Sequence, residues 1–164
     1  MRLFIAIQFS SEMQKELLDT LHRLKQAGVR GNYTPAANLH MTLAFIGETR
    51  QVDEIKEVLN GVKYAPFRLA LTDLGTFGDL LWVGAKGNQG MKKLVRDLRS
   101  GLDAAGISYD KKEFKPHITL IRKMAGSLPR GFTVGKTDMM VKKISLMKSE
   151  NKNGRMVYTE IYSV

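Results

Sequence analysis

Apolar positions along the chain follow two spacings, which predict strands and helices in turn. Alternating runs rich in β-branched and aromatic residues predict strands at 2–9, 39–46, 67–72, 80–84, 118–121, 144–147 and 156–162. Apolar residues repeated every three or four positions predict helices at 13–24, 52–60 and 89–104. This mixture of elements predicts an α+β or α/β protein.

The ends of the two long helices carry local signals. The string Ser11-Glu12-Met13-Gln14 has the S-x-x-Q form of a capping box, which predicts that Ser11 caps the first helix. Gly28 and Gly106 follow the two helices and are expected to end them.

A shift of 77 residues lays the second half of the chain on the first without a gap. It places His40-Met41-Thr42-Leu43 on His117-Ile118-Thr119-Leu120, in a chain with only three histidines. Identical residues also coincide in the two long helices, where the pairs are Lys15 and Lys92, Leu17 and Leu94, Leu21 and Leu98, and Ala27 and Ala104. The match is weakest where the helical segment 52–60 falls on 129–137, which lacks helical spacing.

We therefore predict an internal duplication, approximately 2–72 and 79–149, within a single bilobed domain, 1–164. Two copies of a strand–helix–strand unit imply two similar lobes, each a small sheet backed by a helix.

Charge adds a candidate partner to this picture. The 164 residues include 26 Lys and Arg against 16 Asp and Glu, which leaves a net charge of +10. A basic surface concentrates anions, of which nucleic acid is the usual polymer, although a merely basic soluble protein fits the charge equally well. The absence of cysteine excludes disulfides, thiolate metal sites and cysteine nucleophiles.

No stretch of the sequence reads as a targeting or membrane segment. The apolar run Leu3–Ile7 is too short for the core of a signal peptide. No apolar run approaches the roughly 20 residues that span a bilayer. We expect a cytoplasmic protein with no membrane partner.

The repeated His-x-Thr strings suggest phosphoryl chemistry. Side chains at i and i+2 of a strand share a face, so His40 projects with Thr42, and His117 with Thr119. One neutral imidazole can take a proton from an attacking water while one imidazolium protonates the departing oxygen. Threonine hydroxyls can donate hydrogen bonds to the non-bridging oxygens of the phosphate. The hypothesis requires the two pairs to face each other across a cleft.

Each histidine also has a simpler interpretation. A single histidine on a half-buried strand is usually structural, and only the recurrence of the same flanks in both halves argues otherwise. His22 lies in a predicted helix without a partner motif, and we assign it to the surface. A zinc site is the other alternative, but zinc normally has a third protein ligand, and neither motif carries a carboxylate at ligand spacing.

The two strings Asn38-Leu39-His40-Met41-Thr42-Leu43 and Lys115-Pro116-His117-Ile118-Thr119-Leu120 resemble the paired motifs of the 2H phosphoesterase superfamily. The opening Met1–Ile7 and the later Ile121-Arg122 resemble its bacterial and archaeal branch, the RNA 2',3'-cyclic phosphodiesterases, also named 2'-5' RNA ligases. The resemblance covers nearly the whole chain.

The resemblance implies a bilobed, pseudo-two-fold α+β fold, with antiparallel sheets backed by helices and both motifs in a central cleft. It implies that a terminal 2',3'-cyclic phosphate is opened to a 2'-phosphate without metal or cofactor. By the same resemblance His40 is the proton donor, His117 is the proton acceptor, and Thr42 and Thr119 hold the phosphate. From the sequence alone the two histidines are equivalent, and their roles would exchange in the reverse reaction.

Three positions near the motifs are further candidates. Tyr33 stands where relatives often carry tryptophan, and its ring could stack on a base. Lys115 stands where relatives often carry arginine; the lysine keeps the positive charge but cannot make the paired hydrogen bonds that a guanidinium makes to a phosphate. Arg122 is retained and is a candidate phosphate contact, with a solvated arginine at a strand end as the alternative.

The expected partner is RNA with a cyclic phosphate end, with tRNA fragments among the candidates, and we expect a monomer. Since a cyclic phosphate requires a 2'-hydroxyl, the chemistry would select RNA over DNA. Two alternatives remain open: 2'-5' ligation or hydrolysis of a small cyclic nucleotide, and a non-catalytic RNA-binding module.

Overall fold

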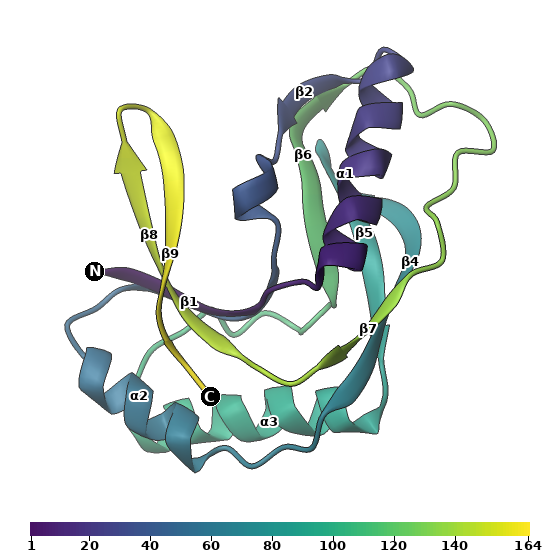
Figure 1. Ribbon diagram of the computed structural model, residues 1–164. Coiled ribbons are helices and arrows are strands. Elements are labelled where there is room, and N and C mark those ends of the chain that lie inside the picture. The colour runs from purple at the N-terminus through teal and green to yellow at the C-terminus, as the bar shows by residue number, and fades with distance from the viewer.

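Nine strands form two antiparallel sheets, and three α-helices cover them (Figure 1). The computed structural model describes residues 1–164. The elements in chain order are β1 (Arg2–Ile7), α1 (Ser11–Gln26), β2 (Arg30–Tyr33), the 3-10 turn η1 (Ala36–Asn38), β3 (Met41–Glu48), α2 (Val52–Gly61), β4 (Phe67–Phe77), β5 (Leu80–Gly87), α3 (Gln89–Ala104), β6 (His117–Ala125), β7 (Asp138–Val141), β8 (Ser145–Lys152) and β9 (Arg155–Ser163). The predicted α+β class with antiparallel sheets is confirmed.

Each sheet is assembled from both halves of the sequence. The first sheet has the order β3-β1-β8-β9 and the second has the order β2-β6-β5-β4-β7. The shift of 77 residues relates β1 to β5, β3 to β6 and β4 to β8, so the two sheets share one order with the strands β4 and β8 exchanged. The common order supports the proposed duplication, but the repeats do not coincide with the lobes.

The division of the helices between the two sheets also does not follow the two repeats. Figure 1 shows α1 over the five-stranded sheet, whereas α2 and α3 run together beneath the four-stranded sheet. The C-terminal strand is fastened to α2 because the Tyr162 hydroxyl donates to Asn60 Oδ1 at 2.5 Å. None of the helices combines the length and apolar composition that a membrane span requires.

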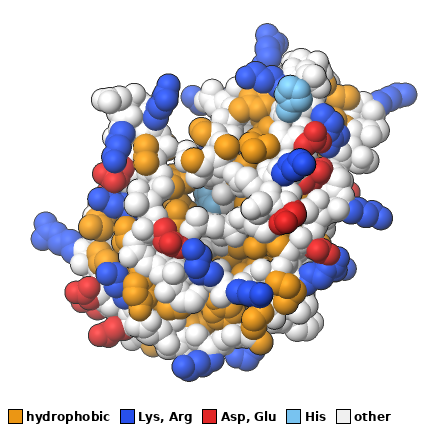
Figure 2. All heavy atoms as spheres, in the orientation of Figure 1, with side chains coloured by type: hydrophobic (Ala, Val, Ile, Leu, Met, Phe, Trp, Pro, Cys, Tyr) orange, Lys and Arg blue, Asp and Glu red, His pale blue; other side chains and the backbone are white.

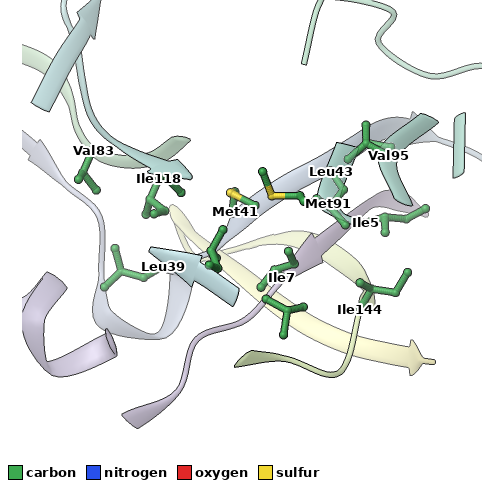
Figure 3. Packing of buried hydrophobic residues seen from close by; sticks show 14 of the residues in the cluster. Ile5, Ile7, Leu39, Met41, Leu43, Val83, Met91, Val95, Ile118 and Ile144 are labelled. Atoms are coloured by element: carbon green, nitrogen blue, oxygen red, sulfur yellow. The ribbon is translucent and has the colours of Figure 1, made fainter. Parts of the chain in front are cut away.

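One continuous apolar core connects the two sheets with the helices (Figure 3). The apolar residues that alternate with the histidines and threonines of the two His-x-Thr strands belong to this core: Met41, Leu43, Ile118 and Leu120 are each at most 1% exposed. Strand geometry then requires the residues between them to face the other way. The core therefore orients both His-x-Thr pairs away from the helices.

The structure corrects several local expectations. Ser10, and not Ser11, caps α1, because its hydroxyl accepts from the Met13 amide at 3.2 Å. The first strand ends at Ile7, two residues before the end of the predicted strand 2–9. The strands β2 and β7 were not predicted, because each is only four residues long and too short to show an alternating pattern. Residues 129–137 contain no helix, as their lack of helical spacing predicted.

Candidate active site

His40 is held at the junction of η1 and β3 by two hydrogen bonds. Its Nδ1 lies 2.7 Å from the Asn38 carbonyl oxygen, and its Nε2 lies 3.0 Å from Thr42 Oγ1. A carbonyl only accepts, so Nδ1 carries a proton and donates it. In the neutral ring Nε2 then accepts from the Thr42 hydroxyl. Nε2 is the nitrogen left to exchange a proton with a bound molecule.

His117 is held in the same way at the start of β6. Its Nδ1 donates to the Lys115 carbonyl at 2.5 Å, two residues upstream, as His40 does to Asn38. Its Nε2 has no hydrogen-bond partner within the protein. Both motifs therefore fix the same tautomer and present the same nitrogen.

Aromatic rings pack against both imidazoles. His40 contacts Phe4 at 4.8 Å and the edge of Tyr158 at 5.2 Å between ring centroids. His117 contacts Phe77 at 5.1 Å and Trp82 at 6.2 Å. These contacts restrict ring rotation, so each Nε2 has a defined direction.

A cleft of about 610 Å³ opens beside His40. This volume suits a small organic ligand. Figure 2 shows a histidine side chain in a recess near the middle of one face. The residues that line the cleft are Asn32, Tyr33, Thr34, Pro35, Ala37, Asn38, His40, Thr119, Arg122, Gly154, Arg155, Met156, Val157 and Tyr158.

Most of the predicted site residues meet at this cleft. His40, Thr119, Arg122 and Tyr33 line it directly. Thr42 reaches it through His40 Nε2. His117 does not line the cleft, but it is near enough for its charge to lower the pKa of His40. The third histidine, His22, is exposed on α1, as predicted.

The surroundings of His40 favour its neutral form. Burial lowers the pKa of His40 most, and the nearby charges of Arg122 and His117 lower this pKa further. The hydrogen bond to the Asn38 carbonyl acts in the opposite direction and raises the pKa. An anion bound in the cleft would also raise it, because a negative charge stabilises the imidazolium.

Tyr33 presents its ring to the cleft but turns its hydroxyl away. The hydroxyl donates to the Val29 carbonyl at 2.6 Å, and Lys25 Nζ lies 5.7 Å from the ring centroid. Burial raises the pKa of Tyr33, so the phenol stays protonated. The side chain of Lys115 extends over Phe77, with Nζ 6.0 Å from the ring centroid.

Asn38 and Tyr158 are among the site residues that the sequence did not reveal. Asn38 was part of the quoted motif, but nothing in its position two residues before His40 revealed what its side chain contacts. Tyr158 lies in the last strand, far from either motif, and no local signal connects it with His40.

The polar side chains that line the cleft carry imidazole, hydroxyl, amide and guanidinium groups. The chain contains no group of three or more His, Asp or Glu side chains arranged to hold a metal ion.

Comparison with known proteins places this geometry in a family. Residues 11–153 match the model of the 2'-5' RNA ligase superfamily. The chain belongs to the 2'-5' RNA ligase superfamily. This confirms the resemblance drawn from the two motifs.

Individual members of the superfamily share much of the sequence and fold. The RNA 2',3'-cyclic phosphodiesterase of Escherichia coli is 30% identical over an alignment of 170 positions, gaps included, which covers 98% of this chain and 93% of the relative. The corresponding enzyme of Geobacillus stearothermophilus is 32% identical over 135 residues, but these span only 43% of its length. The crystal structure of E. coli LigT complexed with 3'-AMP superposes with a TM-score of 0.84 at 26% identity and covers 99% of this chain and 95% of that chain.

Proposed function

We propose that this protein hydrolyses the 2',3'-cyclic phosphate end of RNA to a 2'-phosphomonoester without a metal ion. His40 is the proton donor and His117 is the proton acceptor. The observation that carries the proposal is the matched fixation of the two rings, each through Nδ1 to the carbonyl two residues upstream. The activity named for the Escherichia coli and Geobacillus relatives supports the reaction.

The proposed chemistry needs two proton transfers at one phosphorus. A water oxygen attacks phosphorus while the Nε2 of His117 takes one of its protons. The bond between phosphorus and the 3' oxygen breaks, and the Nε2 of His40 gives its proton to that oxygen. The products are a 2'-phosphate and a 3'-hydroxyl, and each ring returns to its starting state by exchange with solvent.

The donor role requires that His40 gains a proton as the substrate binds. In the empty cleft the pKa of His40 is lowered by burial and by positive charge. A phosphodiester carries a negative charge, which offsets Arg122 and stabilises the imidazolium. Protonation of Nε2 also removes the acceptor of the Thr42 hydroxyl, so that hydroxyl can donate to a phosphate oxygen while the Nε2 proton is available to the 3' oxygen.

Thr119 and Arg122 are the proposed contacts for the non-bridging oxygens. Thr119 is placed by its neighbours, since Thr34 donates to its carbonyl at 3.0 Å and the Thr34 amide donates to the Leu120 carbonyl at 2.9 Å. A hydroxyl and a guanidinium already in place stabilise developing charge without further reorganisation.

Ligation is the second candidate reaction, because the matched family model bears the name of 2'-5' RNA ligase. In that reaction the 5' hydroxyl replaces water as the nucleophile, so His117 would take its proton and His40 would still protonate the departing 3' oxygen; the roles exchange only when the 2'-5' bond is cleaved in reverse. An RNA with a free 5' hydroxyl, added beside the cyclic-phosphate RNA, tests whether a joined product forms.

The central experiment uses a short RNA with a 2',3'-cyclic phosphate end and resolves the products by 31P NMR. We expect a 2'-phosphate and an unchanged rate in excess chelator. His40→Ala and His117→Ala should each lower kcat by about 100-fold or more. The double variant should add little, since residues that act as a unit are not additive.

His22→Ala is the matched control, because it removes the exposed third histidine from α1. It should leave the rate unchanged. A near-normal rate in either cleft variant contradicts the two-histidine mechanism, and loss of turnover in chelator contradicts metal independence.

A further inference from the structure

We propose that Asn38 is a positioning residue that ties His40 to the β9 side of the cleft. This proposal rests on the proposed function for its kinetic consequences, but the geometry that carries it is independent of the substrate. Asn38 ends η1 and is buried, with 9% of its surface exposed.

The two ends of Asn38 make different contacts. Its backbone carbonyl accepts from His40 Nδ1 at 2.7 Å. Its side-chain amide donates from Nδ2 to the Met156 carbonyl of β9 at 2.9 Å. One residue therefore connects the imidazole with a strand 118 positions away in the sequence.

The strand at the far end of this connection is a wall of the cleft. Arg155, Met156 and Tyr158 of β9 line it, and the edge of Tyr158 also packs on the His40 ring at 5.2 Å. β9 is an edge strand that pairs only with β8, so its other side is free to accept from Asn38. A molecule that contacts β9 therefore acts on the same backbone that positions His40.

The second motif lacks such a tie. Lys115 occupies the position equivalent to Asn38 under the shift of 77 residues, and its carbonyl accepts from His117 Nδ1 at 2.5 Å. Its side chain, however, is exposed and lies over Phe77 instead of reaching an opposite wall. Only the histidine proposed as proton donor is coupled to β9.

Loss of the amide should loosen the carbonyl that supports His40. Asn38→Ala keeps the carbonyl but releases η1 from β9, so the bond to Nδ1 weakens. That bond raises the pKa of His40, so its weakening should lower this pKa further. The titratable or charged groups around the ring are otherwise unchanged: Arg122 and His117 of β6, Tyr33 of β2, and Arg155 and Tyr158 of β9.

The test compares Asn38→Ala and Asn38→Asp with Asn88→Ala. The control removes a side-chain cap of α3 outside the cleft, where Asn88 Oδ1 accepts from the Gly90 amide at 2.8 Å, and so matches a loss of stability. Asn38→Ala should lower kcat/KM by about 10- to 100-fold, because a small displacement of a reacting group can cost up to about 100-fold in rate. Asn88→Ala should lower the melting temperature and leave kcat/KM within about twofold of the parent.

Asn38→Asp supplies a readout that a merely structural role would not move. A carboxylate cannot donate to the Met156 carbonyl, but a protonated carboxyl can. The ratio of variant to parent kcat/KM should therefore be highest at acid pH and fall as pH rises. A ratio independent of pH, or an Asn38→Ala variant that behaves like Asn88→Ala, overturns the proposal.

A substrate-free measurement separates this proposal from the proposed function. 15N NMR of the imidazoles should show the Nδ1–H form of His40 in the parent and a mixture of tautomers in Asn38→Ala. If the parent turns over no RNA but the tautomer still changes, only the proposed function fails. If the tautomer and the His40 titration are the same in both proteins, the role of Asn38 fails.

Discussion

Arg122 offers the sharpest test of how the cleft handles charge. It lies on β6, three residues after Thr119, and lines the cleft with His40, and its positive charge contributes to the lowered pKa of His40. Two interpretations compete: a direct contact to the substrate phosphate, and a solvated arginine, which lies within β6 and not at the strand end that the sequence suggested. Arg122→Gln removes the charge, whereas Arg122→Lys keeps the charge and removes the bidentate fork.

The two interpretations differ by a measurable factor. A hydrogen bond to a charged group contributes about 1.5–3 kcal/mol. At about 1.4 kcal/mol per tenfold change in rate, loss of a phosphate contact lowers kcat/KM by roughly 10- to 150-fold. A surface substitution stays within about 0.5 kcal/mol, or roughly twofold. Arg122→Lys should fall between these limits, since it keeps the charge alone.

The pH dependence follows from the sign of the interaction. Arg122 disfavours the imidazolium, so Arg122→Gln should raise the pKa of His40 towards its ordinary value. A proton donor is active below its pKa. The limb of kcat/KM that belongs to His40 should therefore move to higher pH in Arg122→Gln, even though the maximum rate is lower.

The assay measures kcat/KM for the cyclic-phosphate RNA between pH 5 and 9 at one fixed salt concentration, because RNA binding depends on salt. Arg96→Gln is the matched control: it removes the same charge from α3, where the side chain is 72% exposed. Equal rates in Arg122→Gln and Arg96→Gln, with superimposable pH profiles, would refute the phosphate contact and leave Arg122 as a solvated residue.

Two further outcomes are expected. Thr42→Val should lower kcat roughly tenfold, since it removes the hydroxyl that lies 3.0 Å from His40 Nε2. The control Thr159→Val, at an exposed position of β9, should leave kcat unchanged in steady-state assays. Equal kcat values in the two variants would contradict the role of Thr42. The pKa of Glu160 is lowered by the Ser145 hydroxyl and then by Lys143, so its contribution to stability is present above its unfolded pKa and is lost as pH falls through its folded pKa. Urea denaturation between pH 3 and 7 should therefore show a weaker loss of stability on acidification in Glu160→Gln than in the parent.

Much of the site followed from local rules of the sequence. Alternation along a strand placed His40 with Thr42, and His117 with Thr119, because Met41 and the other intervening apolar residues had to be buried. The shift of 77 residues aligned the two histidines, and in the structure both donate from Nδ1 to the carbonyl two residues upstream.

Contacts between distant segments were beyond the reach of the sequence. Strand pairing depends on the whole fold, so nothing local predicted that β8 would lie beside β1, or β6 beside β2. The contact of Tyr158 with His40 follows from that pairing, because β9 reaches the cleft only through β8. The choice of Ser10 over Ser11 as the cap was also undecidable locally, since both are serines and differ only in backbone conformation.

Because each sheet contains strands from both halves of the sequence, two histidines in the same repeated motif can have different surroundings. Identical His-x-Thr strings carry no information about which ring donates a proton, because both fix Nδ1 in the same way. The surroundings make the difference: His40 from the first half feels Arg122 and His117 from the second half, and is tied through Asn38 to β9. Burial lowers the pKa of His40 most, the hydrogen bond to the Asn38 carbonyl of the first half raises it, and the charges of Arg122 and His117 of the second half lower it, so a substitution in either half can change the chemistry of His40.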